Sequence, residues 1–391
     1  MKTQSKQSHF IMYISLLCVS FLALFVRYLG RDFISGDFED CMLPWYQEIV
    51  DAGPGIGALL SYSGDYALPY AFLIWLLSKL PIPFLYSVKM LHTLFDFGLA
   101  ILTGLIVQQF KPDHNYIFAY GYSIALLLPN VFMNSTYWAQ CDVIYTCFLL
   151  AAFLCYLHKK YPAMMFLFGV AFSFKLQSVF FLPFILIVYW VKKEFSILQF
   201  LIIPIAMFIM NIPSMAAGYS PFVTFTQYTW QASGYPWLYY FYPNLYFFFQ
   251  ARPYYLFSSG AIMLTIAILL IFVVLMIKKN VTITRDDLLS ILLWTSYTCV
   301  FLLPSMHERY GYFPEMIAVI FAIVNIRRAW IALGMILCTF PKYLYALDLT
   351  GNPLGMQMVT AAGNSLIYIA FTCIIWRRLF QENRRNADVE N

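Results

Sequence analysis

Apolar residues run in long blocks along this chain, and polar residues gather at the ends of the blocks. Residues 195–251 and 349–376 contain no Asp, Glu, Lys or Arg. A helix needs about 20 apolar residues to cross the hydrocarbon core of a bilayer. The strict alternation of a membrane β-barrel does not run through these blocks. The pattern therefore predicts an all-α polytopic membrane protein.

The blocks divide into a bundle of about 12 predicted transmembrane helices. Their ranges are 10–26, 84–110, 116–134, 143–157, 162–174, 178–190, 197–213, 258–277, 288–304, 312–326, 329–345 and 361–376. The apolar stretch 68–80 is too short to span. We expect it to be an interfacial helix of the first outer loop, which is acidic.

Composition and charge sharpen this interpretation. The chain is 62% hydrophobic and 11% charged, whereas about 25% of a soluble domain is charged, so a water-soluble, disordered or nucleic-acid-binding protein is excluded. Most of the 24 basic residues cluster at block ends, and the positive-inside rule assigns those ends and both termini to the cytoplasm. Lys2 and Lys6 precede an apolar run without a cleavage motif, which predicts an uncleaved anchor. The outer side is then acidic, which suggests that the chemistry is outside.

Four polar groups at outer helix ends are the candidate chemistry, because charges near membrane depth are costly and usually functional. The first lies in residues 35–46, where Asp37, Glu39 and Asp40 precede Pro-Trp-Tyr. It is either a solvated acidic loop with an aromatic anchor or a catalytic carboxylate near the membrane surface. Asp37 and Asp40 are three residues apart, so on a helical turn both would point the same way.

The second group is Trp138, Gln140 and Asp142. An interfacial Trp with Asp142 as a helix cap would explain part of it. The combination also resembles a sugar-binding surface, since a sugar offers an apolar ring face for stacking and hydroxyls for Gln and Asp.

The third group is Lys175 and Gln177, between two short predicted helices. Snorkelling would explain an isolated lysine, but an outward lysine opposes the positive-inside bias. Lys175 therefore needs an anionic partner, and a phosphate would serve.

The fourth group is His307, Glu308, Arg309 and Tyr310. Three consecutive ionisable residues at a span boundary are rarely structural. Arg and protonated His donate charge-assisted hydrogen bonds to phosphate oxygens. No HExxH zinc motif is present.

Weaker signals remain. Lys89, His92 and Asp96 share one helix face, and we favour mutual pairing inside the bundle over ligand contact. The aromatic segment 215–255 is too irregular to cross lipid and is either the wall of an isoprenoid groove or an interfacial belt. A disulfide between Cys41 and Cys141 is possible.

Together, in this order, the four groups resemble the GT-C superfamily of membrane glycosyltransferases, most closely bacterial proteins related to the PIG-V type mannosyltransferase of GPI-anchor synthesis. The matching parts are the first-loop Asp before Pro-Trp-Tyr, Trp-x-Gln-x-Asp, Phe-Lys-x-Gln and His-Glu-Arg-Tyr. Ala139 stands where the family often has Gly, and Gly311 where an aromatic often follows the Tyr.

The resemblance implies a single glycosyltransferase domain over residues 1–391, with a catalytic-type module at 1–190 and more variable helices at 191–391. The donor would be a polyprenyl-phosphate-linked hexose such as mannose, and the acceptor a lipid-linked glycan or cell-surface polysaccharide. No cofactor is required, and a divalent metal is possible. We expect an outward-facing site in a bacterial plasma membrane.

The implied roles follow the motifs. The catalytic base is Asp37, with Asp40 as the alternative, and transfer inverts the anomeric centre. Lys175, His307 and Arg309 bind the donor phosphate. The sugar or acceptor contacts are Trp138, Gln140, Asp142, Gln177, Glu308 and Tyr310. The competing functions are a flippase or transporter of lipid-linked sugars and a polysaccharide polymerase or ligase.

Overall fold

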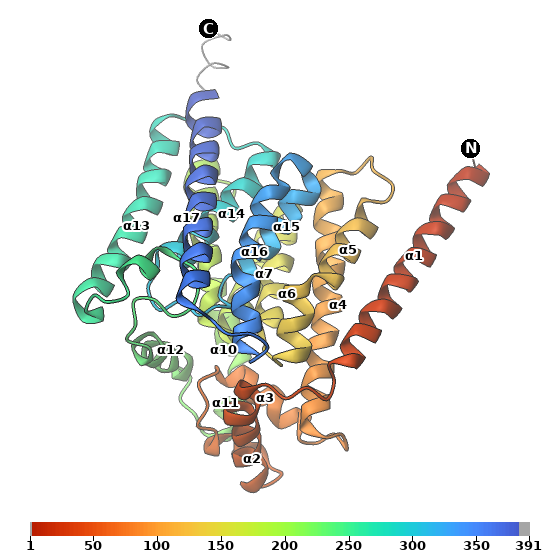
Figure 1. The fold of residues 1–391 in the computed structure, drawn as a ribbon, viewed down its shortest axis with the longest axis vertical. Helices are drawn as coiled ribbons and strands as arrows, with labels where there is room; N and C mark the ends of the chain where they lie inside the picture. Colours follow the sequence, from red (N-terminus) through yellow and green to blue (C-terminus); the bar gives the residue numbers. More distant parts are fainter. Residues whose placement is uncertain (1, 383–391) are drawn as a thin grey trace. The chain divides into compact units, whose positions relative to one another are not determined.

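All regular elements of the described chain are helices (Figure 1). The computed structural model describes residues 2–382. Five helices are long and apolar enough to cross a membrane, or six if one bent pair counts as a single span. An all-helical membrane protein is thereby confirmed, while the count of twelve crossings stays a prediction. Several predicted crossings correspond to apolar helices of only 10–17 residues.

The described helices group into two compact units. Unit 1 comprises Met1–Leu176 and Leu198–Ala232, and unit 2 comprises Gln177–Ile197 and Ser233–Asn391. Residues 198–232 thus pack with the N-terminal part of the chain, across the boundary near residue 190 suggested by the sequence.

The long helices of unit 1 include α1 (Lys2–Leu29) and α4 (Phe84–Phe110), and the latter has the predicted bounds. The other elements of the bundle are α5 (Ile117–Leu127), α6 (Pro129–Phe132), η3 (Met133–Tyr137), α7 (Asp142–Leu157), α8 (Tyr161–Phe174) and α10 (Ile202–Met210). In Figure 1, α1 leans away from α4 and α5 toward its N-terminal end. Exposed apolar side chains such as Phe21 and Leu22 cover α1, as expected of a helix that faces lipid.

Glycines let the helices of unit 1 approach closely. A Cβ added at Gly121 of α5 would lie 2.9 Å from Gly104 Cα of α4. At Gly169 of α8 an added Cβ would lie 2.7 Å from the Ile203 carbonyl oxygen of α10. Small residues serve this purpose in membrane bundles, where close backbone packing replaces much of the hydrophobic driving force.

Short elements cover one end of unit 1, at the lower edge of Figure 1. They are η1 (Phe38–Met42), α2 (Leu43–Asp51), η2 (Ile56–Ser61), α3 (Leu68–Leu77) and α11 (Ile212–Ala217). Helix α3 is the predicted interfacial helix, and it packs against α2, α4, α8, α11 and η2. Helix α12 (Val223–Gly234) follows, and its Gln227 accepts a hydrogen bond from the Leu68 backbone N–H at 3.4 Å.

Unit 2 is built around α14 (Arg285–Leu302), whose residues 287–302 are all buried. Its other helices are α9 (Leu182–Ile187), α13 (Tyr254–Lys278), α15 (Tyr312–Val324), α16 (Ala329–Ala346) and α17 (Leu354–Arg377). Shorter elements are η4 (Leu176–Phe181), η5 (Val188–Lys192), η7 (Leu245–Phe249), η8 (Ile326–Arg328) and η9 (Arg378–Glu382). The short helix η6 (Ile197–Leu201) lies mostly in unit 1. Helix α14 begins with a capping box formed by Thr284 and Asp287, which satisfies backbone donors at its first turn.

Candidate functional site

The first candidate site forms where the loop after α1 meets the segment between η3 and α7. Asp37 Oδ2 accepts hydrogen bonds from Trp138 Nε1 at 2.8 Å and from Gln140 Nε2 at 2.6 Å. The two donors are fully buried, whereas Asp37 is half-buried. Two groups that the sequence separates by about a hundred residues thus form one cluster. It holds a carboxylate in a fixed orientation while leaving it partly accessible.

Local backbone structure explains why Trp138 and Gln140 reach this position. Leu128 is extended because the residue before a proline is disfavoured in a helix, and the helix predicted at 116–134 bends by 49° before Pro129. Ala139 then adopts a left-handed backbone with φ 59°. The Gln140 N–H bonds the Asn134 carbonyl oxygen at 2.9 Å, which fixes this turn.

Ser35 positions the other side of the cluster. Its hydroxyl donates to the Trp138 carbonyl oxygen at 2.9 Å and accepts from the Phe38 N–H at 3.2 Å. A serine in this position caps the helical turn that begins at Gly36. Ser35 is buried, and so the turn that carries Asp37 is tied directly to the Trp138 segment. Our sequence interpretation included Ser35 in the loop but assigned it no role.

Asp40 is exposed, whereas Asp37 meets Trp138 and Gln140. The two carboxylates therefore lie in different environments, although they were expected to point the same way. The intervening turn belongs to the π-helix η1, whose wider turn changes the spacing that an α-helix would give. Of the two proposed bases, Asp37 is the one built into the cluster.

Tyr66 joins the cluster from the loop before α3. Its hydroxyl donates to Gln140 Oε1, so the Gln140 amide links Tyr66 to Asp37. The Tyr66 ring packs edge-to-face on Trp45 and Tyr70, with ring centroids 5.3 Å and 5.2 Å apart. The sequence interpretation gave Tyr66 no role in the site.

Further tyrosine hydroxyls stay protonated in this region. Burial raises the pKa of Tyr62 and of Tyr70 well above the ordinary value. Tyr62 donates to the Tyr66 carbonyl oxygen at 3.2 Å, while the Tyr70 hydroxyl lies 3.1 Å from His92 Nε2. These aromatic residues therefore act as neutral hydrogen-bonding groups near neutral pH.

Lys175 and Asp142 form a buried ion pair in unit 1. Lys175 Nζ donates to Asp142 Oδ1, and Asn134 Nδ2 donates to Asp142 Oδ2 at 3.0 Å. The ammonium group also lies 5.5 Å from the centroid of the Tyr66 ring, within cation–π range. The anionic partner that Lys175 was expected to need is thus present in the protein as Asp142. Asp142 is the first residue of α7 and is fully buried.

The three ionisable residues of α4 do not pair with one another, contrary to our expectation. Lys89 Nζ donates to the carbonyl oxygens of Gly30, Arg31 and Phe33 at 2.9, 3.1 and 2.5 Å. Asp96 Oδ2 accepts from Arg27 Nη2 at 2.7 Å and from Ser135 at 2.5 Å. The expectation was wrong because helix periodicity shows only which residues share a face of α4. The groups that bind these three side chains come from α1, the loop after α1, α3 and η3.

The fourth polar group belongs to unit 2. His307, Glu308 and Arg309 are all buried, and Arg309 Nη1 lies 3.3 Å from Glu308 Oε1. The His307 ring packs against Tyr240 and Tyr235, with centroids 4.3 Å and 4.8 Å apart. Gln177, the remaining predicted contact, is buried in η4 of the same unit.

Part of the aromatic segment 215–255 holds this group in place. The Tyr242 N–H donates to the Met306 carbonyl oxygen at 3.1 Å, and Ser305 bonds the carbonyl oxygens of Tyr235 and Trp237 at 2.9 Å each. The role of this part of the segment as a support for residues 305–310 was not foreseen. Burial, reinforced by Glu308, raises the pKa of Tyr239 above its ordinary value.

Two buried charges of unit 2 were missed. Glu315 is on α15, and Lys342 of α16 donates to Asn352 Oδ1 at 3.0 Å. The sequence contained a signal for both residues, because each is a lone charge inside a predicted span, and such a charge marks a functional candidate.

In residues 2–382 no three His, Cys, Asp or Glu side chains are grouped so that they could hold a metal ion. No disulfide links Cys41 and Cys141 in the described chain. The sequence matches no model of a known protein family and no curated protein.

Proposed function

We propose that this protein is a membrane-embedded glycosyltransferase. It would move a hexose from a polyprenyl-phosphate donor to a lipid-linked glycan or surface polysaccharide. The observation that carries the proposal is the half-buried Asp37 carboxylate, oriented by Trp138 and Gln140. The resemblance of the four polar groups to GT-C enzymes supplies the reaction class.

The residues suggest a single displacement. The acceptor hydroxyl transfers its proton to Asp37 while its oxygen forms a bond to the anomeric carbon. The bond from that carbon to the phosphate oxygen breaks, and the polyprenyl phosphate leaves with the electron pair. A positioned general base contributes about 10²–10⁴ in rate. Trp138 and Gln140 would hold Asp37 in its orientation.

The developing negative charge of the phosphate needs cations. We keep for this role His307 and Arg309, both of unit 2, and the assignment rests on the resemblance of the sequence motifs alone. Preorganised cations in a dry site stabilise a leaving anion more than they would in water. Since Lys175 already pairs with Asp142, its first role is to position the Asp142 and Tyr66 side of the cluster.

The decisive experiment is transfer by the purified full chain in lipid nanodiscs. A panel of radiolabelled polyprenyl-phosphate sugars is offered with membrane lipid extract as acceptor. We expect label in a new product with wild type and with Asp40→Asn, and at least a 100-fold loss with Asp37→Asn. Asp40→Asn is the matched control because it removes an exposed carboxylate three residues away.

Each other outcome has a defined meaning. Wild-type transfer by Asp37→Asn removes Asp37 from the mechanism, and loss confined to Asp40→Asn makes Asp40 the base. Movement of intact donor across the bilayer without product supports the flippase instead.

A further inference from the structure

A cavity of about 710 Å³ lies between α1 and α4, within unit 1. Its size falls in the range of about 300–1,000 Å³ that is usual for small-molecule sites. Most of its wall is apolar, including Leu24, Leu77, Met90, Leu94 and Phe97. Leu94 and Met90 are 69% and 59% exposed. Because these side chains belong to helices that cross the membrane, the cavity is open to the lipid phase.

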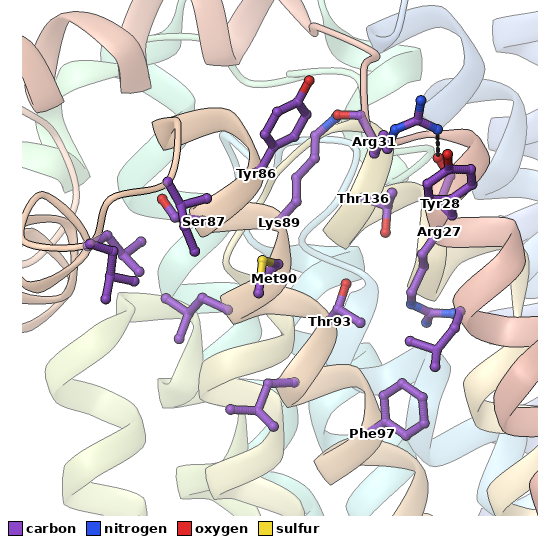
Figure 2. Close-up of a pocket in the computed structure, with 16 residues that line it drawn as sticks. Arg27, Tyr28, Arg31, Tyr86, Ser87, Lys89, Met90, Thr93, Phe97 and Thr136 are labelled. Atoms are coloured by element: carbon purple, nitrogen blue, oxygen red, sulfur yellow. Dashed lines mark hydrogen bonds between the residues drawn. The ribbon is translucent and has the colours of Figure 1, made fainter.

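Cations collect at one end of this cavity. Figure 2 shows Tyr86, Lys89 and Arg31 at one end and Phe97 at the other. Arg27, Arg31 and Lys89 line the wall. The first two have carboxylate partners, because Arg27 pairs with Asp96 and Arg31 with Asp32. Lys89 instead donates to three uncharged carbonyl oxygens.

The charge balance of the whole cavity wall and its direct partners is therefore positive by one. Three cations of the wall are set against two carboxylates, neither of which lines the cavity, and the excess charge belongs to Lys89. A cation near the apolar phase attracts an anion strongly, since screening by water is weak there. An occupant of matching shape has one anionic group at the Lys89 and Arg31 end and an apolar chain along Leu94 and Phe97.

We propose that this cavity binds one anionic glycerophospholipid of the surrounding membrane. Its phosphate would face Arg31, next to the positive charge of Lys89, whose three N–H groups stay on the carbonyl oxygens, and an acyl chain would fill the space between α1 and α4. The neutral polar groups of the lining, Tyr86, Ser87 and Thr136, suit phosphate and glycerol oxygens. The lining lacks the carboxylates and amides that hold sugar hydroxyls, so it favours a bilayer phospholipid over a sugar-bearing donor. The inference does not depend on the proposed transferase activity.

The test measures lipid retention by native mass spectrometry. The full chain in detergent receives equimolar phosphatidylglycerol and phosphatidylcholine with the same acyl chains. We expect one phosphatidylglycerol per chain, retained at least fivefold over phosphatidylcholine. Two variants should each reduce this retention at least fivefold. Arg31→Gln removes a partly exposed charge, and Leu94→Trp fills the apolar end.

Two control variants, on α4 or just past its end, make the same kinds of change outside the cavity. Ile101→Trp adds the same bulk at an exposed position of α4 that does not line the cavity. Lys111→Gln removes an exposed charge just past the end of α4. Both should retain lipid as wild type does. Equal retention of the two lipids, or wild-type retention by Arg31→Gln or Leu94→Trp, overturns the proposal. So does displacement of the phospholipid by an equimolar polyprenyl phosphate.

Discussion

Gln140 is the residue on which the Asp37 cluster depends most directly. Its amide accepts from Tyr66 and donates to Asp37, so both ends of the amide are engaged. Trp138 supplies a second donor to the same carboxylate oxygen. A carboxylate with two fixed donors has little rotational freedom, which is what a general base requires before the acceptor arrives.

The buried Lys175–Asp142 pair gives a prediction about stability. Lys175→Met leaves Asp142 as an uncompensated buried charge, and breaking such a pair costs about 3–5 kcal/mol. Adding Asp142→Asn removes that charge while keeping a partner for Asn134. We expect the single variant to melt far below wild type and the double variant to recover most of the loss, measured by thermal unfolding in nanodiscs.

The same double variant tests the role of Lys175 in the reaction. If Lys175 contacts the donor phosphate or Asp142 contacts the sugar, the stable double variant transfers no sugar. Full transfer by that variant limits Lys175 to a structural role. A double variant as unstable as Lys175→Met would contradict the pairing.

At the scale of elements, the join between η3 and α7 determines the geometry of the Asp37 cluster. The bend before Pro129 and the left-handed Ala139 together redirect the chain. A left-handed φ costs an L-residue about 1–2 kcal/mol, and this cost falls on a fully buried alanine.

Ala139 therefore gives a second prediction. Ala139→Gly removes the strain, and the greater freedom of glycine in the unfolded chain offsets about 0.5–1 kcal/mol. We expect a net gain of about 0.5–1 kcal/mol in the free energy of unfolding. Ala139→Val, with a branched side chain in the same backbone, should lose at least as much. Thermal unfolding of the purified variants measures both, and a valine variant as stable as wild type would show that the turn relaxes.

Gly311 permits a close approach in unit 2 and gives a third prediction. A Cβ there would lie 2.6 Å from Tyr242 Cε2 and 2.7 Å from Glu315 Oε1. Gly311→Ala should therefore displace Tyr242, and with it the Met306 contact, at a cost of about 1–3 kcal/mol. The reduced melting temperature of this variant is the measurement. Gly234→Ala is the control, because an added Cβ meets nothing within 4 Å there.

Sequence patterns predicted single helices better than the contacts between distant parts of the chain. The run at 84–110 contains no proline, and it forms one helix with those bounds. The run at 116–134 was predicted as one helix although it contains Pro129, which breaks it. Asp37, Trp138 and Gln140 were each singled out, yet their contact spans 101 and 103 positions of chain. Local periodicity carries no information at that separation.

For the whole molecule, the predicted orientation in the membrane can be tested directly. The positive-inside rule places helix α2 on the outer side of the membrane and the C-terminal end of α13 on the cytoplasmic side. Asp51→Cys should react with a membrane-impermeant maleimide on intact cells. Asn280→Cys should react only after permeabilisation. Both positions are exposed, and the wild-type chain measures the background from its eight cysteines. The reverse labelling pattern would put the Asp37 cluster on the cytoplasmic side.

The Lys89 contacts also have a mechanical consequence. One ammonium group grips three carbonyl oxygens of the short linker between α1 and the turn that carries Asp37. These contacts tie the linker to α4, so a change in the tilt of α1 would pass to the turn that carries Asp37. Helices in bilayers of unequal thickness change their tilt. A thicker or thinner membrane would therefore change the position of Asp37, and the activity of the protein would vary with the thickness of the bilayer.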